Sequence, residues 1–70
     1  MRDELIESIK DILEVDQINM EDELESFEMW DSLAKLSLVT SIDEIFKKSI
    51  NEEVVDEFKI VSDIFEYLQT

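Results

Sequence analysis

The 70-residue chain contains no cysteine, no histidine, no glycine and no proline. Without cysteine it can form neither a disulfide nor a thiolate metal site, which fits a reducing compartment. Without histidine it lacks the commonest general base and the commonest metal ligand. Without glycine and proline it lacks the usual turn residues, so we expect aspartate, asparagine and serine to cap its helices and form its turns.

Basic residues are scarce as well: six lysines and arginines stand against 20 aspartates and glutamates, which gives a formal net charge of −14. This charge repels nucleic-acid phosphates, favours basic protein partners and disfavours self-association, so we expect a monomer that binds no nucleic acid. No apolar run approaches the roughly 20 residues of a membrane span, and the acidic N-terminus lacks the apolar core of a signal peptide. We therefore expect a cytoplasmic protein.

The length predicts a single domain over residues 1–70. A chain of this size buries only about 60% of the surface that its unfolded form exposes, which leaves little room for a deep catalytic cleft. Because 44% of the residues are hydrophobic and many recur at helical spacing, we expect a folded domain rather than a disordered acidic segment.

Helical periodicity appears in three segments, over residues 3–14, 32–48 and 60–68. In each of them the apolar residues recur three or four positions apart, so that one face of the helix can be buried. The residues that share a face are, in chain order, Leu5, Ile6, Ile9, Ile12 and Leu13; Leu38, Val39, Ile42, Ile45 and Phe46; and Val61, Ile64, Phe65 and Leu68.

Two further segments lie between these helices. Residues 15–30 show no clean period, and we expect a long loop that Ile18, Met20, Leu24, Phe27 and Trp30 pin to the core. Loops longer than about 12–15 residues are uncommon and often functional. A short helix that buries Val54, Val55 and Phe58 is expected after a cap at Ser49 or at Asn51. The sequence thus predicts an all-α fold, a four-helix bundle with three main helices and a short third helix.

An Asp31-Ser32-Leu33 tripeptide stands where the long loop meets the second main helix. Asp31 can cap that helix, because its carboxylate can accept hydrogen bonds from the amides of the first turn. Ser32 would then lie on the first turn with its hydroxyl in solvent. A phosphodiester at such a helix N-terminus gains roughly 0.3–1 kcal/mol from the helix dipole. Taken alone, the tripeptide favours an ordinary serine that follows an aspartate cap.

The surroundings of the tripeptide resemble the acyl carrier protein family over nearly the whole chain. The segments that carry the resemblance are Asp31-Ser32-Leu33, Asp43-Glu44-Ile45-Phe46, Ile50-Asn51-Glu52-Glu53 and Val61 to Leu68, in this order and spacing. The resemblance implies a four-helix carrier fold with a 4′-phosphopantetheine on Ser32, which a phosphopantetheinyl transferase installs from coenzyme A. It also implies that an acyl- or aminoacyl-loading ligase charges the arm, that downstream transferases unload it, and that the carrier itself is not an enzyme.

Some residues differ from the pattern of the family. Met29-Trp30 replaces the small pair that usually precedes the tripeptide, and residues 32–48 carry a net charge of +1 where fatty-acid carriers are strongly acidic. We therefore expect a specialised pathway rather than housekeeping fatty-acid synthesis, and partners that are less basic than usual. The residues expected to dock on such partners are Leu33, Leu36, Thr40, Asp43 and Glu44, together with Lys35 on an open helix face.

Other interpretations remain open. The cargo could be aminoacyl or peptidyl rather than acyl. The domain could instead be an unmodified acidic module that binds a basic protein. A Ser32–Lys35 dyad is conceivable on spacing, but a lysine on an open face stays protonated, so we expect no catalysis. The acidic residues 16–25 lack the glycine of an EF-hand, and we expect no metal site there.

Overall fold

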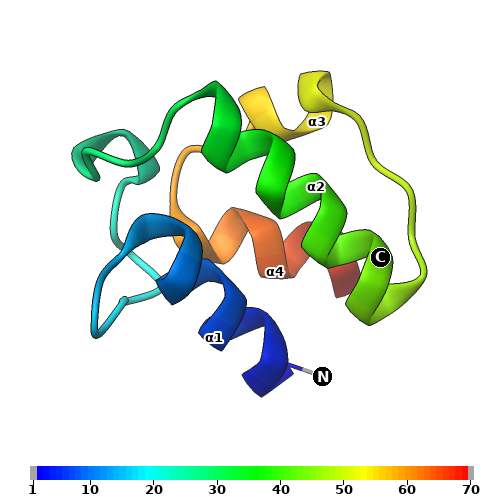
Figure 1. Ribbon diagram of the computed structural model, residues 1–70, viewed down its shortest axis with the longest axis horizontal. Coiled ribbons are helices and arrows are strands. Elements are labelled where there is room, and N and C mark those ends of the chain that lie inside the picture. Colours follow the sequence, from blue (N-terminus) through cyan, green and yellow to red (C-terminus); the bar gives the residue numbers. More distant parts are fainter. Residues whose placement is uncertain (1, 70) are drawn as a thin grey trace.

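The computed structural model describes residues 2–69, and within them the backbone forms four α-helices and one short 3₁₀ helix (Figure 1). No strand forms over these residues, although an isolated antiparallel bridge joins Glu23 to Ile60. The predicted all-α fold with a short third helix is confirmed. In chain order the elements are α1 (Arg2–Leu13), η1 (Leu24–Ser26), α2 (Ser32–Phe46), α3 (Glu52–Asp56) and α4 (Val61–Gln69).

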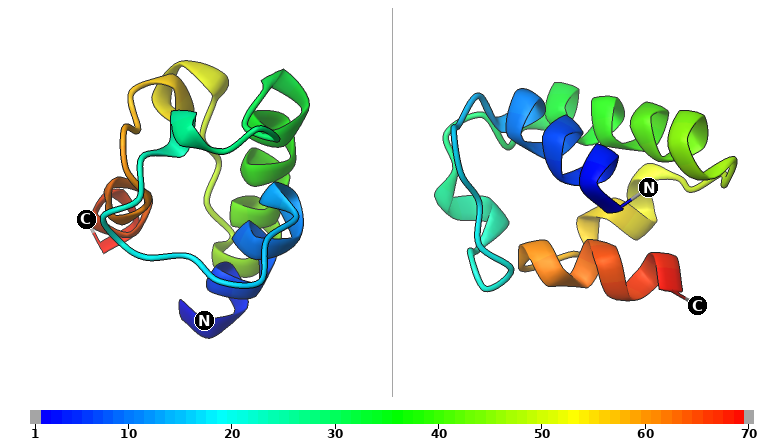
Figure 2. Two further views of the ribbon diagram at one scale, coloured as in Figure 1. Left: turned by 90° about the vertical axis from the view of Figure 1, so that its left-hand side faces the viewer. Right: turned by 90° about the horizontal axis from the view of Figure 1, so that it is seen from below.

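The helices surround one apolar core. Figure 2 shows α1 and α2 side by side, with α4 on the opposite side of the molecule and the short α3 between α2 and α4. Each of the four helices contributes side chains to the core, as do the connection between α1 and α2 and the one between α3 and α4. The removal of these apolar side chains from water is the main stabilising term of the fold. The buried core residues are Leu5, Ile9, Leu13, Leu24, Leu38, Ile42, Val55, Phe58, Val61, Ile64 and Phe65.

The loop between α1 and α2 is anchored to the rest of the chain. Leu24 is fully buried, and Ile18, Met20, Phe27 and Trp30 pack against the core as predicted, whereas Met29 is exposed. Backbone hydrogen bonds also tie the loop to the start of α4: the amide of Leu24 donates to the carbonyl of Lys59 at 2.9 Å, and the amide of Val61 donates to that of Asp22 at 3.0 Å. These contacts therefore hold the loop, and with it the residues that precede α2, in a fixed position.

Several predicted helix ends are wrong by one or two residues. The first helix ends at Leu13 and the second at Phe46, because Glu14 and Lys47 each adopt a left-handed conformation with φ of 56°. In a chain without glycine, other residues must take the turn that terminates a helix. The alternative cap at Ser49 is also wrong: Asn51 caps α3, and its side-chain oxygen accepts from the amide of Val54 at 3.0 Å. The last helix begins at Val61, since Ile60 is engaged in the bridge.

Candidate functional site

Ser32 is the first residue of α2, and its side chain is exposed. The residue before it, Asp31, is extended and caps the helix: Oδ1 accepts a hydrogen bond from the amide of Ala34 at 2.9 Å. The backbone carbonyl of Asp31 accepts the amide of Lys35 at 3.0 Å. Among the described residues, the amides of Ser32 and Leu33 have no backbone acceptor. With the positive end of the helix dipole, these two free N–H donors make this end of α2 favourable for an anion.

The predicted docking residues form one exposed stripe along α2. Leu33, Leu36, Thr40, Asp43 and Glu44 all have exposed side chains, and they recur at the three- and four-residue spacing of one helix face. Leu33 is 74% exposed and Leu36 is 50% exposed, and their spacing of three residues makes them neighbours on this face. The hydroxyl of Thr40 donates to the carbonyl of Leu36 at 3.2 Å and remains on this outer face.

The charge of α2 differs from the prediction. Because the helix ends at Phe46, the two lysines that follow it do not belong to it, and α2 itself holds one lysine and two carboxylates. Its net charge is therefore −1 rather than +1. Lys48 turns towards α4, where its Nζ lies 5.1 Å from the centre of the Tyr67 ring. The helix nevertheless remains much less acidic than the chain as a whole, whose net charge is −14.

The sequence predicted Lys35 on an open helix face, and this prediction is wrong. Its Nζ forms an ion pair with Oδ1 of Asp56 in α3 at 2.8 Å, and it lies 5.9 Å from the centre of the Trp30 ring. The hydrogen bond to Asp56 raises the pKa of Lys35 above its usual 10.5. The lysine therefore stays protonated and cannot serve as a base for Ser32, and its charge is already engaged by α3 rather than offered to a partner.

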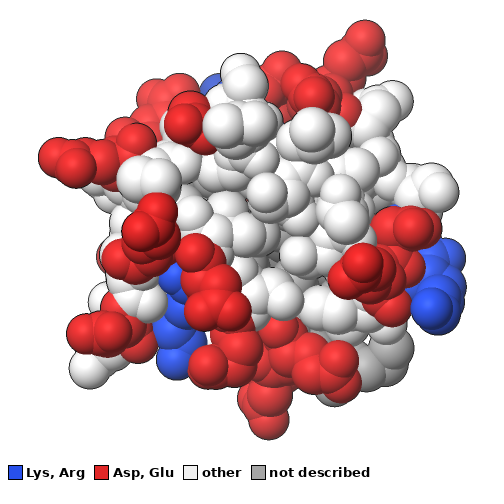
Figure 3. All heavy atoms as spheres, in the orientation of Figure 1, with Lys and Arg blue, Asp and Glu red and all other residues white. Residues whose placement is uncertain are grey.

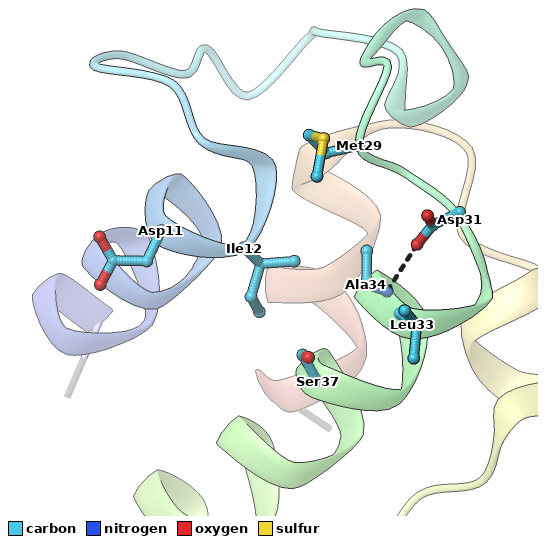
Figure 4. A pocket seen from close by; sticks show the side chains of 7 residues that line it. All are labelled: Asp11, Ile12, Met29, Asp31, Leu33, Ala34 and Ser37. Carbon is cyan, nitrogen blue, oxygen red and sulfur yellow. Dashed lines mark hydrogen bonds between the residues drawn. The ribbon is translucent and has the colours of Figure 1, made fainter.

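A groove opens between the end of α1 and the start of α2 (Figure 4). It has a volume of ≈ 370 Å³. Ile12 from α1 and Ser37 from α2 point towards each other across it, while the carboxylate of Asp11 is turned away from the other side chains. The lining residues are Asp11, Ile12, Met29, Asp31, Leu33, Ala34 and Ser37.

The sequence did not predict this groove. The residues 33, 34 and 37 lie on one side of a helix, which helical spacing alone indicates. Ile12 meets this side of α2 only through the packing of α1 against α2. Met29 reaches the groove because the long loop is anchored at the start of α4. Figure 3 shows the result on one face of the molecule, where aspartates and glutamates surround an uncharged area between α1 and α2.

Over residues 2–69, no three carboxylates gather in a way that could hold a metal ion. In the acidic loop, Oδ2 of Asp22 instead accepts the amide of Asn19 at 2.9 Å and forms a turn. Within the same range, none of the helices is both long and apolar enough to cross a membrane.

Comparison with known proteins gives one relevant similarity. The chain is 35% identical over 65 residues to a curated protein of Phytoplasma mali (strain AT) named acyl carrier protein. The alignment covers 90% of this chain and 77% of that protein. No family model matches the chain, and no solved structure matches it.

Proposed function

The chain belongs to the acyl carrier protein family, and we propose that it carries a 4′-phosphopantetheine arm on the hydroxyl of Ser32. As a member of this family it is a carrier and not an enzyme. The observation that supports the attachment site is the exposed Ser32 at the first position of α2, directly after the Asp31 cap. In the transfer from coenzyme A, the serine oxygen forms a bond to the phosphorus that carries pantetheine, and the phosphoanhydride bond of that phosphorus breaks. Adenosine 3′,5′-bisphosphate leaves with the electron pair of the broken bond, and the serine hydroxyl gives up its proton.

The residues around Ser32 fit such an arm. The free amides at the N-terminus of α2 could donate hydrogen bonds to a phosphodiester on Ser32, and the helix dipole would favour its negative charge by roughly 0.3–1 kcal/mol. Asp31 would add like charge, but one of its oxygens accepts the amide of Ala34, so the carboxylate is held in a capping position. The thiol at the end of the arm would hold an acyl or aminoacyl group as a thioester.

We propose that partner enzymes dock on the exposed stripe of α2. Leu33 and Leu36 would supply the apolar contact next to the arm, and Thr40, Asp43 and Glu44 would extend the contact along the helix. The partners are a phosphopantetheinyl transferase, an acyl- or aminoacyl-loading ligase, and downstream transferases. Lys35 is left out of this surface, since it is paired with Asp56.

We further propose a specialised pathway in the cytoplasm, with the protein acting as a monomer. Support for the pathway comes from Trp30, which packs on the core just before the tripeptide, and from the uncharged Ala34 and Ser37 on a helix that is otherwise acidic in fatty-acid carriers. The proposal fails if fatty-acid elongation enzymes of the same cell use the modified protein as readily as their own carrier.

The attachment can be tested by intact mass after incubation with coenzyme A and a broad-specificity phosphopantetheinyl transferase. The native chain should gain the mass of one phosphopantetheine, and Ser32→Ala should gain none. Ser49→Ala, which removes another exposed serine, should be modified like the native chain. If the folded native chain gains no mass while a known carrier does, the acidic interaction module becomes the better interpretation.

A further inference from the structure

The groove between α1 and α2 gathers most of the exposed apolar surface in the described part of the chain. Three large apolar side chains are exposed there, Met29, Leu33 and Leu36. Met29 and Leu33 both line the groove, and Leu36 lies three residues further along α2. Scattered single apolar residues on a surface need no explanation, whereas exposed apolar residues that gather in one place often mark an interaction site. The groove is therefore a candidate for such a site.

The groove is formed by short side chains that lie between longer ones. Ala34 and Ser37 lie three residues apart on α2, and Ile12 of α1 points towards Ser37 (Figure 4). Met29 of the long loop and Leu33 of the first turn of α2 complete the apolar lining. The volume of ≈ 370 Å³ is near the small end of the range of about 300–1,000 Å³ for ligand pockets, and the groove is open to solvent. It suits one protruding side chain better than an enclosed small molecule.

Carboxylates stand around this apolar lining. Asp31 lines the groove at the start of α2, and Asp11 lines it from α1 with its carboxylate turned outwards. None of the described residues that line the groove is a lysine or an arginine. Lys10, next to Asp11 in the chain, is paired with Glu7 at 2.8 Å. Figure 3 shows further aspartates and glutamates around the same uncharged area. Positive charge around an apolar side chain would complement this face.

The charge of the chain disfavours other kinds of occupant. A net charge of −14 repels nucleic-acid phosphates and anionic membrane surfaces. It also repels a second copy of the chain, whose own groove carries the same carboxylates. A basic protein surface is attracted instead, and this attraction raises the rate at which the two surfaces meet.

From these observations we propose that the groove between α1 and α2 is a docking site for a partner protein that presents one bulky apolar side chain between lysine or arginine residues. The apolar side chain enters between Ile12, Met29 and Leu33, and the basic residues pair with Asp11 and Asp31. Ser32 does not line the groove, so the proposal does not depend on whether Ser32 is modified.

The test is an NMR titration of the unmodified protein with three synthetic peptides of equal length. The first has a central phenylalanine between lysines, the second has alanine in place of the phenylalanine, and the third has glutamates in place of the lysines. The first should shift the methyl signals of Ile12 and Met29, because an aromatic ring in the groove changes the local magnetic field. Met20 and Ile50 pack on the core and do not line the groove, so they are internal controls. The second peptide should bind about tenfold more weakly, and the third should not bind.

Apolar and bulky substitutions then locate the contact. Met29→Ala removes part of the apolar lining and should weaken binding of the first peptide about threefold. Ser37→Phe fills the groove from an exposed position and should abolish binding. Ser49→Phe places the same ring on an exposed position outside the groove and should leave binding unchanged. The urea midpoint of each variant establishes that it is folded.

A pair of charge substitutions tests the rim. Asp11→Asn should weaken binding of the first peptide about twofold at 0.15 M salt, since it removes one exposed ion pair. Glu66→Gln removes the same charge from an exposed position on α4, on the opposite side of the molecule, and should change binding much less.

Several results would overturn the docking site. Binding of the first peptide that is undetectable at millimolar concentration, or shifts spread over the whole surface, would do so. If Leu36→Ala weakens binding more than Met29→Ala does, the stripe of α2 holds the peptide instead. Equal binding of the glutamate peptide would make the groove a site for apolar ligands irrespective of charge. Shifts of Ile12 and Met29 on concentration of the protein alone would assign the groove to a second copy. None of these outcomes bears on Ser32, because every titration uses unmodified protein.

Discussion

The contacts of Lys35 illustrate what a single side chain does in this fold. It joins the end of the long loop, through Trp30, and the first turn of α2 to the end of α3, through Asp56. The spacing of α2 correctly places Lys35 outside the apolar face. The spacing cannot reveal the partner, because Asp56 lies 21 residues further along the chain and meets Lys35 only in the folded state.

The Lys35–Asp56 pair should contribute a small and conditional stabilisation. Because both side chains are partly exposed, a double-mutant cycle with Lys35→Met and Asp56→Asn should give a coupling free energy of about 0.2–1 kcal/mol. The pKa of Lys35 is raised by the pair, so the coupling should be complete below the usual pKa of 10.5 and be lost as the pH rises through the raised value. Urea unfolding of the four proteins at several pH values measures this. A coupling free energy that changes with neither pH nor salt concentration would indicate packing of the aliphatic part of the lysine side chain instead.

Asp63 caps α4 in the absence of a serine or threonine. Its Oδ2 accepts the amides of Lys59 at 2.8 Å and Ile60 at 3.0 Å, the backward contact of a capping box. These two hydrogen bonds lower the pKa of Asp63 below its usual 3.8.

We expect Asp63→Ala to lower the free energy of unfolding by about 1 kcal/mol at neutral pH, since the two amides lose their acceptor. Because the pKa of Asp63 is lowered by folding, its contribution is present above pH 3.8 and is lost as the pH falls through the lowered value. The difference between native and variant should therefore narrow in acid. Glu66→Ala, at an exposed position of the same helix, should show neither effect, and an equal loss there would argue against capping.

At the scale of elements, the apolar spacing predicts which helices form but not where they stop. The stripe of α2 continues in principle to Lys48, yet the helix ends when Lys47 turns to φ of 56° and donates its amide to the carbonyl of Asp43 at 2.9 Å. Glycine would normally mark such a position, and the chain has none. Ser49 and Asn51 are both good N-cap residues, so the sequence alone does not determine where α3 begins.

The left-handed Lys47 implies that this helix end is strained. A residue with a side chain in this conformation costs roughly 1–2 kcal/mol, of which glycine relieves part while it adds entropy to the unfolded chain. Lys47→Gly should therefore raise the free energy of unfolding by about 0.5–1 kcal/mol, seen as a higher midpoint in urea. Ser49→Gly, two residues on and without a positive φ, should leave the midpoint unchanged or lower it. Equal gains in both variants would refute the assignment of strain to Lys47.

At the scale of the whole molecule, the sequence predicted the Asp31 cap and the exposed position of Ser32, but not the groove between α1 and α2. Ser32 and its cap lie on adjacent positions, so local rules of helix capping suffice to find them. The groove needs Ile12 from α1, Met29 from the loop and Ser37 from α2 to meet, which only tertiary packing decides. The sequence thus predicts the features of the site that depend on neighbouring residues. It does not predict those that depend on how α1 packs against α2.

The net charge of −14 also acts at this scale, because it is spread over a molecule whose longest extent is 27 Å. At about 0.01 M ionic strength the Debye length is ~30 Å, so the carboxylates repel one another across the whole fold, whereas at 0.15 M it is only ~8 Å. The unfolded chain spreads the same charges further apart, so screening should favour the folded state. The midpoint of urea unfolding should therefore rise with sodium chloride over this range.

Divalent cations test whether this stabilisation is general or belongs to a site. Over residues 2–69 no three carboxylates are grouped to hold a metal ion, so calcium chloride and sodium chloride should give the same midpoint when compared at equal ionic strength. Potassium sulfate at the same ionic strength controls for the anion. A rise in midpoint at calcium concentrations that leave the ionic strength nearly unchanged would instead reveal a specific site. In that case the acidic loop before α2 would bind metal as well as position Ser32, because residues 16–25 are the part of the chain where carboxylates are densest around a turn.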